Sequence, residues 1–363
     1  SGGSRRLSLE AARETVLAAR AGLVSVEQQV LLDAVTAYLN VWRDLRVVNV
    51  RESNVRVVTQ QLRAARDRFE VGEDTRTDVA QAEARLAEAR SALAAARGQL
   101  EISRELFALA IGRRPGTLSG PGALPGLPRS QEEAAALARQ NTPSIRQLQH
   151  EVRAAELAVQ GARAAYRPTI TLEGQLSDTF EAPNPLAEDE NASIGLTLRQ
   201  PLYTGGRLSS LERQALAQTA AVRASLNQQT LVNLQIMGNA WAQLRIANAQ
   251  IQAAEQRISA AELAFEGVRE EAALGARTTL DVLDAEQAVL DARISRIEAQ
   301  SNLYLAAYQI LAAAGLLTVE HLDLHVPGYD PAVYYDLVDE APVRVPSVQG
   351  QRLDSVMERL GRD

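Results

Sequence analysis

Apolar residues recur at helical spacing along the first part of the chain. Between about Leu7 and Phe69 there is no proline and a single glycine, Gly22, while apolar residues return every three or four positions. This pattern predicts one continuous helix, on the order of 90 Å long at 1.5 Å per residue. Isolated helices are marginally stable in water, so a helix of this length needs a partner along it.

A strict seven-residue repeat occupies the next segment, from Asp78 to Ile111. Large apolar residues fall on every seventh position, and small residues, mostly alanine, fall between them. The large residues are Val79, Leu86, Leu93, Leu100 and Phe107. Sustained heptads predict left-handed supercoiling, and small residues at one seam position let neighbouring helices approach closely. We therefore predict an antiparallel helical hairpin that turns near Gly72.

The hairpin pattern occurs a second time. The stretch FEVGEDTRTDVAQAE at 69–83 is echoed by EAALGARTTLDVLDAE at 271–286, and in both a glycine is followed six positions later by Asp-Val and then by Ala-Glu. The two glycines, Gly72 and Gly275, lie 203 positions apart, which is far longer than solenoid periods. We infer two large structural repeats and expect both glycines to adopt turn conformations that other residues tolerate poorly.

The segment between the two hairpins reads as a connector followed by two shorter helices. Residues 112–129 are rich in glycine and proline and predict irregular structure. Ser130 with Glu133 predicts a capping box for a short helix. Thr142 before Pro143 predicts the N-cap and the first-turn proline of a longer one.

From Pro168 the apolar period changes from helical to alternating. The runs PTITLEGQLSDTF and ASIGLTLRQPLY alternate apolar and polar residues, and the polar acidic loop EAPNPLAEDEN at 181–191 joins them. This pattern predicts two strands of roughly 10 to 12 residues. It suits a hairpin of a membrane β-barrel and a soluble antiparallel hairpin equally well.

Composition narrows the classes of function. A formal charge of −7 and a pI near 5.3 argue against a nucleic-acid partner, and the absence of cysteine excludes disulfides and thiolate metal sites. No run of about 18 apolar residues predicts a transmembrane helix. The three histidines, His150, His321 and His325, form no metal-binding pattern, and no phosphate-binding loop or dinucleotide fingerprint is present. We therefore predict no catalytic residues, no cofactor and no metal, and a protein that is not an enzyme.

The end of the second predicted strand carries the residues that resemble a known family. In GLTLRQPLYTGGR, at 195–207, a strand ends in Gln-Pro-Leu-Tyr and Gly-Gly-Arg opens a very long helix. This junction, marked by Pro201, Gly205 and Gly206, resembles the TolC family of outer-membrane channels. The tip GARTTLDVLDAE and the proline-led strand entry PTITL are similar to that family too. The resemblance covers residues 1 to about 320.

The resemblance implies a fold that is mainly α with a small β part and two internal repeats. In such a homotrimer, long antiparallel coiled-coil helices form a periplasmic α-barrel tunnel that a membrane β-barrel continues. The implied parts are a first-repeat helical hairpin at 1–111, an equatorial connector at 112–141, a tunnel helix at 142–167, a strand pair with an external loop at 168–203, a second-repeat hairpin at 204–315 and an equatorial C-terminal tail at 316–363.

The resemblance also implies a function and a place in the cell. It implies the exit duct of a tripartite efflux pump or a type I secretion system, a passive conduit gated at its periplasmic helical tips. Its partners would be a periplasmic adaptor (membrane fusion) protein, an inner-membrane transporter and outer-membrane lipid. The chain would lie in the cell outer membrane, with most of its length in the periplasm.

Asp281 and Asp284 carry the expectation for the gate. They lie three positions apart on one helix face and match the aspartate ring of the family, whose negative field favours cations. Arg277 matches the arginine that ties one hairpin to its neighbour, with Thr77 and Asp78 as its polar partners. Local sequence alone favours a different interpretation, a solvated helix start at which aspartates stabilise the helix dipole.

Two alternatives remain open at this point. The first concerns the start of the chain. The family has a helix and two strands before each Gly-Gly, whereas Gly2 is preceded by a single residue. We therefore expect a parent chain with a further helix, strand pair and signal peptide, or an SGGS linker in place of native sequence.

The second concerns the class of protein. The heptads alone would also allow a soluble coiled-coil periplasmic adaptor or a structural scaffold. The strand pair within a doubled hairpin favours the channel.

Overall fold

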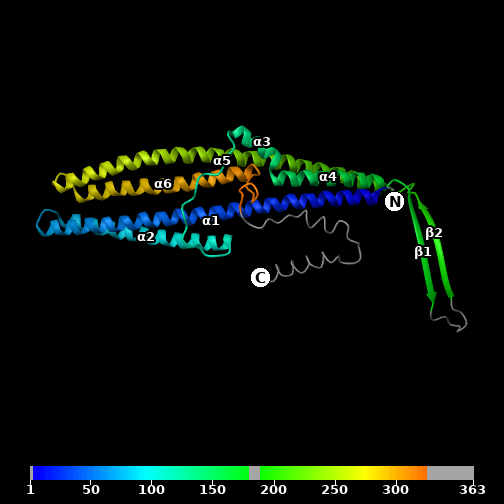
Figure 1. Ribbon diagram of the computed structural model, residues 1–363, viewed down its shortest axis with the longest axis horizontal. Helices are drawn as coiled ribbons and strands as arrows, with labels where there is room; N and C mark the ends of the chain where they lie inside the picture. The colour runs from blue at the N-terminus through cyan, green and yellow to red at the C-terminus, as the bar shows by residue number, and fades with distance from the viewer. Residues whose placement is uncertain (1–2, 180–188, 325–363) are drawn as a thin grey trace. The chain divides into compact units, whose positions relative to one another are not determined.

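Long helices dominate the computed structural model, which describes residues 3–179 and 189–324 (Figure 1). The elements are α1 (Ser4–Glu70), α2 (Arg76–Ile111), α3 (Gln131–Asn141), α4 (Pro143–Ala164), β1 (Thr169–Thr179), β2 (Asp189–Arg199), α5 (Arg207–Ala273) and α6 (Thr279–Ala313). Most of the predicted loop at 181–191, and the tail with His325, lie outside the described residues. The chain divides into a unit ending at Leu317 and a second unit, whose described residues 318–324 form turns.

The helices confirm the predicted internal repeat. α1 and α5 are each 67 residues long, and α2 and α6, which follow them, have 36 and 35 residues. At 1.5 Å per residue, each of the two long helices extends about 100 Å. Equivalent residues also stand at the starts of the helices, since Gly3 and Gly206 precede the long helices while Thr75 and Thr278 precede the short ones.

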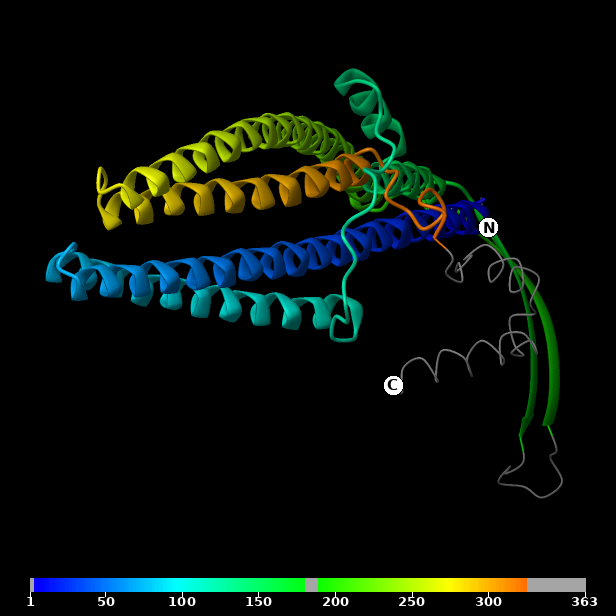
Figure 2. The same ribbon diagram turned by 60° about the vertical axis from the view of Figure 1, so that its left-hand side comes forward.

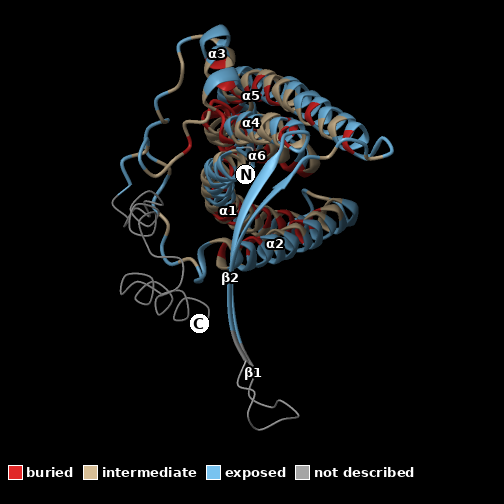
Figure 3. Cartoon of the chain, turned by 90° about the vertical axis from the view of Figure 1, so that its right-hand side faces the viewer, coloured by how far each residue is buried: buried red, intermediate tan, exposed pale blue. Residues whose placement is uncertain are grey.

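Each long helix is covered by more than one partner. The tip half of α1 packs on α2 and the tip half of α5 packs on α6, while α4 packs against the other end of both α1 and α5 (Figure 1). Figures 1 and 2 show the α1–α2 pair lying beside the α5–α6 pair. Buried residues lie on the faces that the helices turn toward one another, as Figure 3 shows. None of the described helices is both long enough and apolar enough to cross a membrane.

The predicted heptad seam forms the core of the first hairpin. One cluster contains Leu100 and Phe107 of α2, packed against Ala37, Val41 and Val48 of α1. A second cluster lies nearer the tip and joins both hairpins. Its members are Val58, Leu62 and Ala65 of α1, Ala82, Leu86 and Ala89 of α2, and Leu283 of α6.

A buried polar node around Asn233 connects the helices at the other end of α6. The Asn233 amide nitrogen donates hydrogen bonds to the Ala138 oxygen, the Thr142 hydroxyl and the Ala313 oxygen at 2.9, 2.7 and 3.2 Å. The Thr142 hydroxyl in turn donates to the Ala138 oxygen at 2.7 Å. Thr142 is the N-cap residue of α4 and Pro143 begins that helix, as predicted, but the Thr142 hydroxyl makes no hydrogen bond to α4. The hydroxyl instead satisfies a carbonyl at the end of α3, where such groups lack a helical partner.

The predicted capping box of α3 is present in altered form. The Ser130 hydroxyl accepts from the Glu133 backbone nitrogen at 3.2 Å, as predicted. The Glu133 carboxylate accepts from the backbone nitrogen of Arg129 at 2.8 Å, one residue before the expected donor. The carboxylate still satisfies a backbone donor at the helix start.

The two strands form the predicted antiparallel hairpin, each with 11 residues. β2 begins at Asp189, inside the segment predicted as loop. In the register of the pair, Ile170 lies opposite Leu198, and Leu172 lies opposite Leu196. All four side chains are exposed, so one face of the hairpin presents an uncovered apolar surface.

Replacing Gly315 with alanine should destabilise the protein more than the same change at Gly112, its counterpart in the first repeat. Both glycines have a positive φ, 75° and 80°, so each substitution carries a backbone cost of roughly 1–2 kcal/mol. A Cβ at Gly315 would also lie 2.6 Å from the backbone oxygen of Asn141, whereas one at Gly112 meets nothing within 4 Å. That overlap should add about 1–3 kcal/mol. Thermal unfolding followed by circular dichroism measures both variants, and equal decreases in the midpoint would contradict the prediction.

Candidate functional site at the hairpin tips

The two tips have the same backbone turn. Gly72 and Gly275 have φ of 81° and 77°. The Glu73 nitrogen donates to the Arg68 oxygen, and the Ala276 nitrogen donates to the Glu271 oxygen, both at 2.9 Å. The turns therefore close the ends of α1 and α5 in the same way, and differences between the tips come from their side chains.

Aspartates cap the helix that leaves each tip. Thr75 and Asp78 form a reciprocal capping box at the start of α2, and Thr278 and Asp281 form its equivalent at the start of α6. Hydrogen bonds from the Thr75 side chain and backbone hold the pKa of Asp78 below its usual value. Bonds from the Thr278 backbone and side chain do the same for the pKa of Asp281. Both carboxylates are thus ionised at neutral pH and already serve as helix caps.

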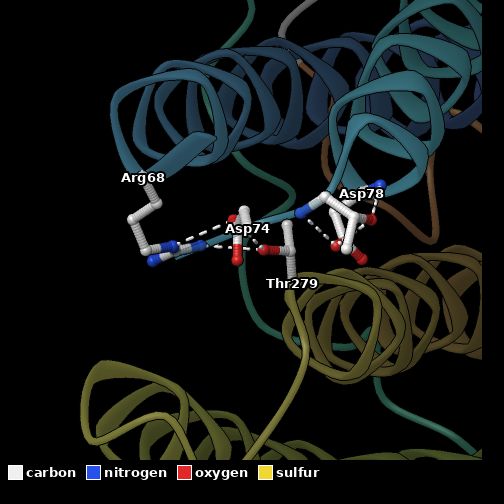
Figure 4. Close-up of polar contacts among 5 residues, drawn as sticks. Arg68, Asp74, Asp78 and Thr279 are labelled. Carbon is white, nitrogen blue, oxygen red and sulfur yellow. Dashed lines mark hydrogen bonds and ion pairs between the residues drawn. The ribbon is translucent and has the colours of Figure 1, made fainter. Parts of the chain in front are cut away.

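A buried threonine links the first tip to the second hairpin. The Arg68 guanidinium pairs with the Asp74 carboxylate at 3.0 Å and donates to the Thr279 hydroxyl at 2.8 Å (Figure 4). The Thr279 hydroxyl donates to the same Asp74 oxygen at 3.3 Å. Thr279 is only 3% exposed, so its side of these bonds is shielded from water, while Arg68 and Asp74 remain partly exposed. This triad connects the end of α1, the first turn and the start of α6.

Two further polar contacts join the same part of α6 to the first hairpin. The Arg85 guanidinium of α2 pairs with Asp284 at 2.5 Å. The Asn54 amide of α1 donates to Glu286 at 2.9 Å. We call the Arg68–Asp74–Thr279 triad, the Arg85–Asp284 pair and the Asn54–Glu286 pair together the tip clasp. All three contacts reach the first turns of α6, so movement of α6 away from the first hairpin would break them together.

The ion pairs across the two turns have opposite polarity. In the first tip, Arg68 precedes the turn and Asp74 follows it. At the equivalent positions of the second tip, Glu271 precedes the turn and Arg277 follows it, with their charged atoms 2.8 Å apart. The bond to Glu271 raises the pKa of Arg277. The repeat has therefore kept the ion pair across each turn while exchanging its charges.

The predicted gate residues lie at the tips with the following contacts. Arg277 pairs with Glu271 of its own hairpin. Thr77 is exposed, and Asp78 caps α2. Asp284 is exposed apart from its ion pair with Arg85, while Asp281 caps α6.

Sequence reasoning missed Arg68, Asp74 and Thr279. A signal for the first two was present, because aligning the repeats places Arg68 on Glu271 and Asp74 on Arg277. No comparable signal indicated Thr279, whose partners come from the other hairpin.

The strand-to-helix junction lies between Arg199 and Arg207. Gly205 and Gly206 have φ of 58° and 84°. The Arg207 nitrogen donates to the Thr204 oxygen at 3.1 Å, and α5 begins there. Pro201 lies in the segment between β2 and these glycines.

Within the described ranges, no group of three or more histidine, aspartate and glutamate side chains could hold a metal ion. The charged groups at the tips form ion pairs and helix caps instead. Their arrangement can hold helices together and present charge at the tips.

A family model described as outer membrane efflux protein matches residues 1–113 and 134–316. The interval between the two matches contains the glycine- and proline-rich connector and the first turn of α3. Both hairpins, α4 and the strand pair all fall inside the matched ranges.

The similar proteins are outer-membrane proteins. Outer membrane efflux protein BepC of Brucella suis is 37% identical over 337 residues, which cover 92% of this chain and 74% of that protein. Outer membrane protein TolC of Vibrio cholerae is 28% identical over 324 residues, covering 86% and 73%. The crystal structure of the outer membrane protein VceC from Vibrio cholerae aligns with a TM-score of 0.76 at 22% identity, covering 86% of this chain and 76% of that one. That likeness confirms the predicted TolC-like fold.

Arg68→Met should loosen the second tip while leaving the first hairpin packed. The variant keeps the aliphatic stem but loses both polar contacts of the guanidinium, which should make local opening of the start of α6 about five- to tenfold more frequent. Hydrogen exchange of peptides covering 276–286 measures this. Arg66→Met is the matched control, because Arg66 pairs with Glu83 within the first hairpin. Equal protection of 276–286 in both variants would show that the triad does not link the hairpins.

Proposed function

The chain belongs to the outer membrane efflux protein family, and we propose that it forms, as a homotrimer, the passive exit duct of an export system that spans the periplasm. It is an outer-membrane channel protein whose helical part is periplasmic. This membership decides against the alternative of a soluble adaptor or scaffold. The helices would form the wall of a tunnel, and the strand pair would lie at its membrane end.

An uncovered apolar seam on α1 is the observation that carries the proposed assembly. Leu9, Val16, Leu23 and Val30 follow one another at seven-residue steps, and each is between 39% and 54% exposed. Heptad-spaced apolar residues mark a face that packs against another helix. Exposed seams of this kind are expected to be covered by helices of other copies in the assembled tunnel.

The strand pair supports the same assembly. Leu176 and Ile194 are 91% and 86% exposed, and they belong to the same apolar face as the four residues paired above. A two-stranded hairpin is marginally stable alone in water. We propose that the strand pairs of several copies join edge to edge in one membrane-spanning sheet, with the apolar face toward lipid.

The tips are proposed to form the gate of the tunnel. In a trimer, Asp281 and Asp284 of three chains would surround the narrow end with negative charge, which favours cations. Arg277, Thr77 and Asp78 would contribute polar contacts between neighbouring tips. The tip clasp would hold the two hairpins of one chain together, so opening requires that contacts within and between chains be exchanged.

The proposed duct also needs partner proteins and a source of energy for export. A passive tunnel needs an inner-membrane transporter to drive export and a periplasmic adaptor to connect the two. The adaptor would dock beside the tips, where the helical hairpins end. The chain itself would perform no chemical step, and its partners would select the cargo.

Changing both Asp281 and Asp284 to asparagine should lower the preference of the channel for cations severalfold. Asparagine can still accept the Thr278 hydrogen bonds that cap α6, so the variant removes charge while keeping the helix start. Conductance in planar lipid bilayers under a salt gradient gives the reversal potential, from which the permeability ratio follows.

Glu101→Gln with Glu105→Gln is the matched control for the gate, because it removes two exposed carboxylates from α2 far from its N-terminal tip. This control should keep the selectivity of the unmodified protein. An unchanged reversal potential in the aspartate variant would remove these two residues from the gate. Absence of any conductance from the unmodified protein would contradict the duct itself.

A further inference from the structure

The two repeats place a glutamate at the same position with different surroundings. Glu83 of the first repeat is exposed and pairs with Arg66. Glu286, its counterpart 203 positions later, is only 8% exposed and lies between α6 and α1. The family resemblance and the capping motifs do not account for a carboxyl group buried at this point.

One oxygen of Glu286 has no partner. Oε1 accepts the hydrogen bond from the Asn54 amide at 2.9 Å, whereas Oε2 is buried without any hydrogen bond. No ion pair involves this carboxyl among the described residues. A buried carboxylate without a cation or a full set of donors is costly. A proton on the carboxyl removes that charge, and it needs no more space than the carboxyl already occupies.

Glu286 also borders a cavity of about 370 Å³ between the two hairpins. The other ionisable residues that line it are Glu262, Glu266 and Arg269 of α5 and Arg293 of α6. Arg293 pairs with Glu262 at 2.7 Å, and Arg269 stacks over Phe265. Neither arginine forms an ion pair with Glu286 among the described contacts.

On its other side, Asn54 borders a smaller cavity of about 50 Å³. The charged residues lining that cavity are Arg51 of α1 and Arg85 and Glu88 of α2. Arg85 pairs with both Glu88 and Asp284. Arg85, Arg269 and Arg293 thus have acidic or aromatic partners of their own, and among the described contacts Arg51 forms no ion pair with Glu286.

We propose that Glu286 is a proton-operated latch between the two hairpins of one chain. With its carboxyl neutral, the Asn54–Glu286 contact stays buried and the tip clasp stays closed. When the carboxyl ionises, the charge draws water into the adjoining cavity and the start of α6 separates from α1. The same movement strains the Arg85–Asp284 pair and the Thr279 bonds, because all three contacts reach the first turns of α6.

The direction of the pH dependence follows from the burial of the carboxyl. Burial raises the pKa of Glu286 from 4.5 to about 7, and the hydrogen bond from Asn54 opposes the shift. The joined arrangement binds the proton more tightly than the separated one, so it is favoured most below pH 4.5 and loses this advantage as the pH rises to about 7. Over that range the ratio of joined to separated hairpins should fall by up to roughly 300-fold.

The latch rests on the proposed function only in that the tips form the gate, and its test does not require conductance. The chain has no cysteine, so Val71→Cys and Leu274→Cys introduce a single pair of labelling sites. Both positions are highly exposed and are equivalent in the two tips. Spin labels on this pair report the distance between the tips by double electron–electron resonance. Labelled protein is diluted with unlabelled protein so that each measured pair belongs to one chain.

The distance distribution of the full chain is recorded from about pH 4 to about pH 8.5, which includes the range on both sides of the expected transition. A short-distance population should give way to longer distances, with a midpoint between about pH 4.5 and about pH 7. Glu286→Gln, which is isosteric and always neutral, should keep the short distance at every pH. Glu83→Gln, the matched control in the first repeat, should titrate like the unmodified protein.

Asn54→Asp provides a second variant should the glutamine variant fold poorly. A second carboxyl beside Glu286 disfavours ionisation of the pair, so the midpoint should move to higher pH. A tip distance that does not change with pH, or a Glu286→Gln variant that titrates like the unmodified protein, would overturn the latch. A midpoint that Asn54→Asp leaves in place would do the same. Conductance of the same preparations then tests the duct separately. A tip distance that changes with pH as predicted, in a protein that forms no conducting channel, would contradict only the proposed function.

Discussion

Two 67-residue helices that must be covered along their whole length constrain everything else in the chain. A helix of that length has no core of its own, and its stability comes from the faces it buries. α2 and α6 cover the tip halves, and α4 covers part of the remainder of both long helices. The apolar seam that stays exposed near the start of α1 then calls for a partner outside the chain. The hairpins and the proposed assembly both follow from this requirement.

The repeat keeps its backbone and varies its side chains. Both tips share the glycine turn, the threonine cap and the aspartate of the capping box. They differ in the polarity of the ion pair across the turn and in the burial of the glutamate that follows. Two hairpins with one geometry and different charges can pack beside each other without being interchangeable. In a gate, this difference allows one hairpin to stay anchored while the other responds.

The fold could be predicted from the periodicity of the sequence. The site could be predicted only in part, because it depends on side-chain contacts between different helices. The heptads, the 203-position repeat and the alternating strands each depend on spacing alone, so the long helices and the β-hairpin could be predicted. Spacing also placed the N-cap of α4 at Thr142, but it could not show that the hydroxyl bonds to a carbonyl of the preceding helix instead of to α4. The contact between Arg68 and Thr279 depends on how one hairpin is rotated against the other, which no spacing within either hairpin encodes.

Single-particle electron microscopy of the detergent-purified protein would show whether the long helices of several copies enclose a conduit. We expect a hollow cylinder with threefold symmetry and helical walls about 100 Å tall. Solid rods made of one or two copies, with the apolar seam of α1 covered and no central channel, would contradict this expectation.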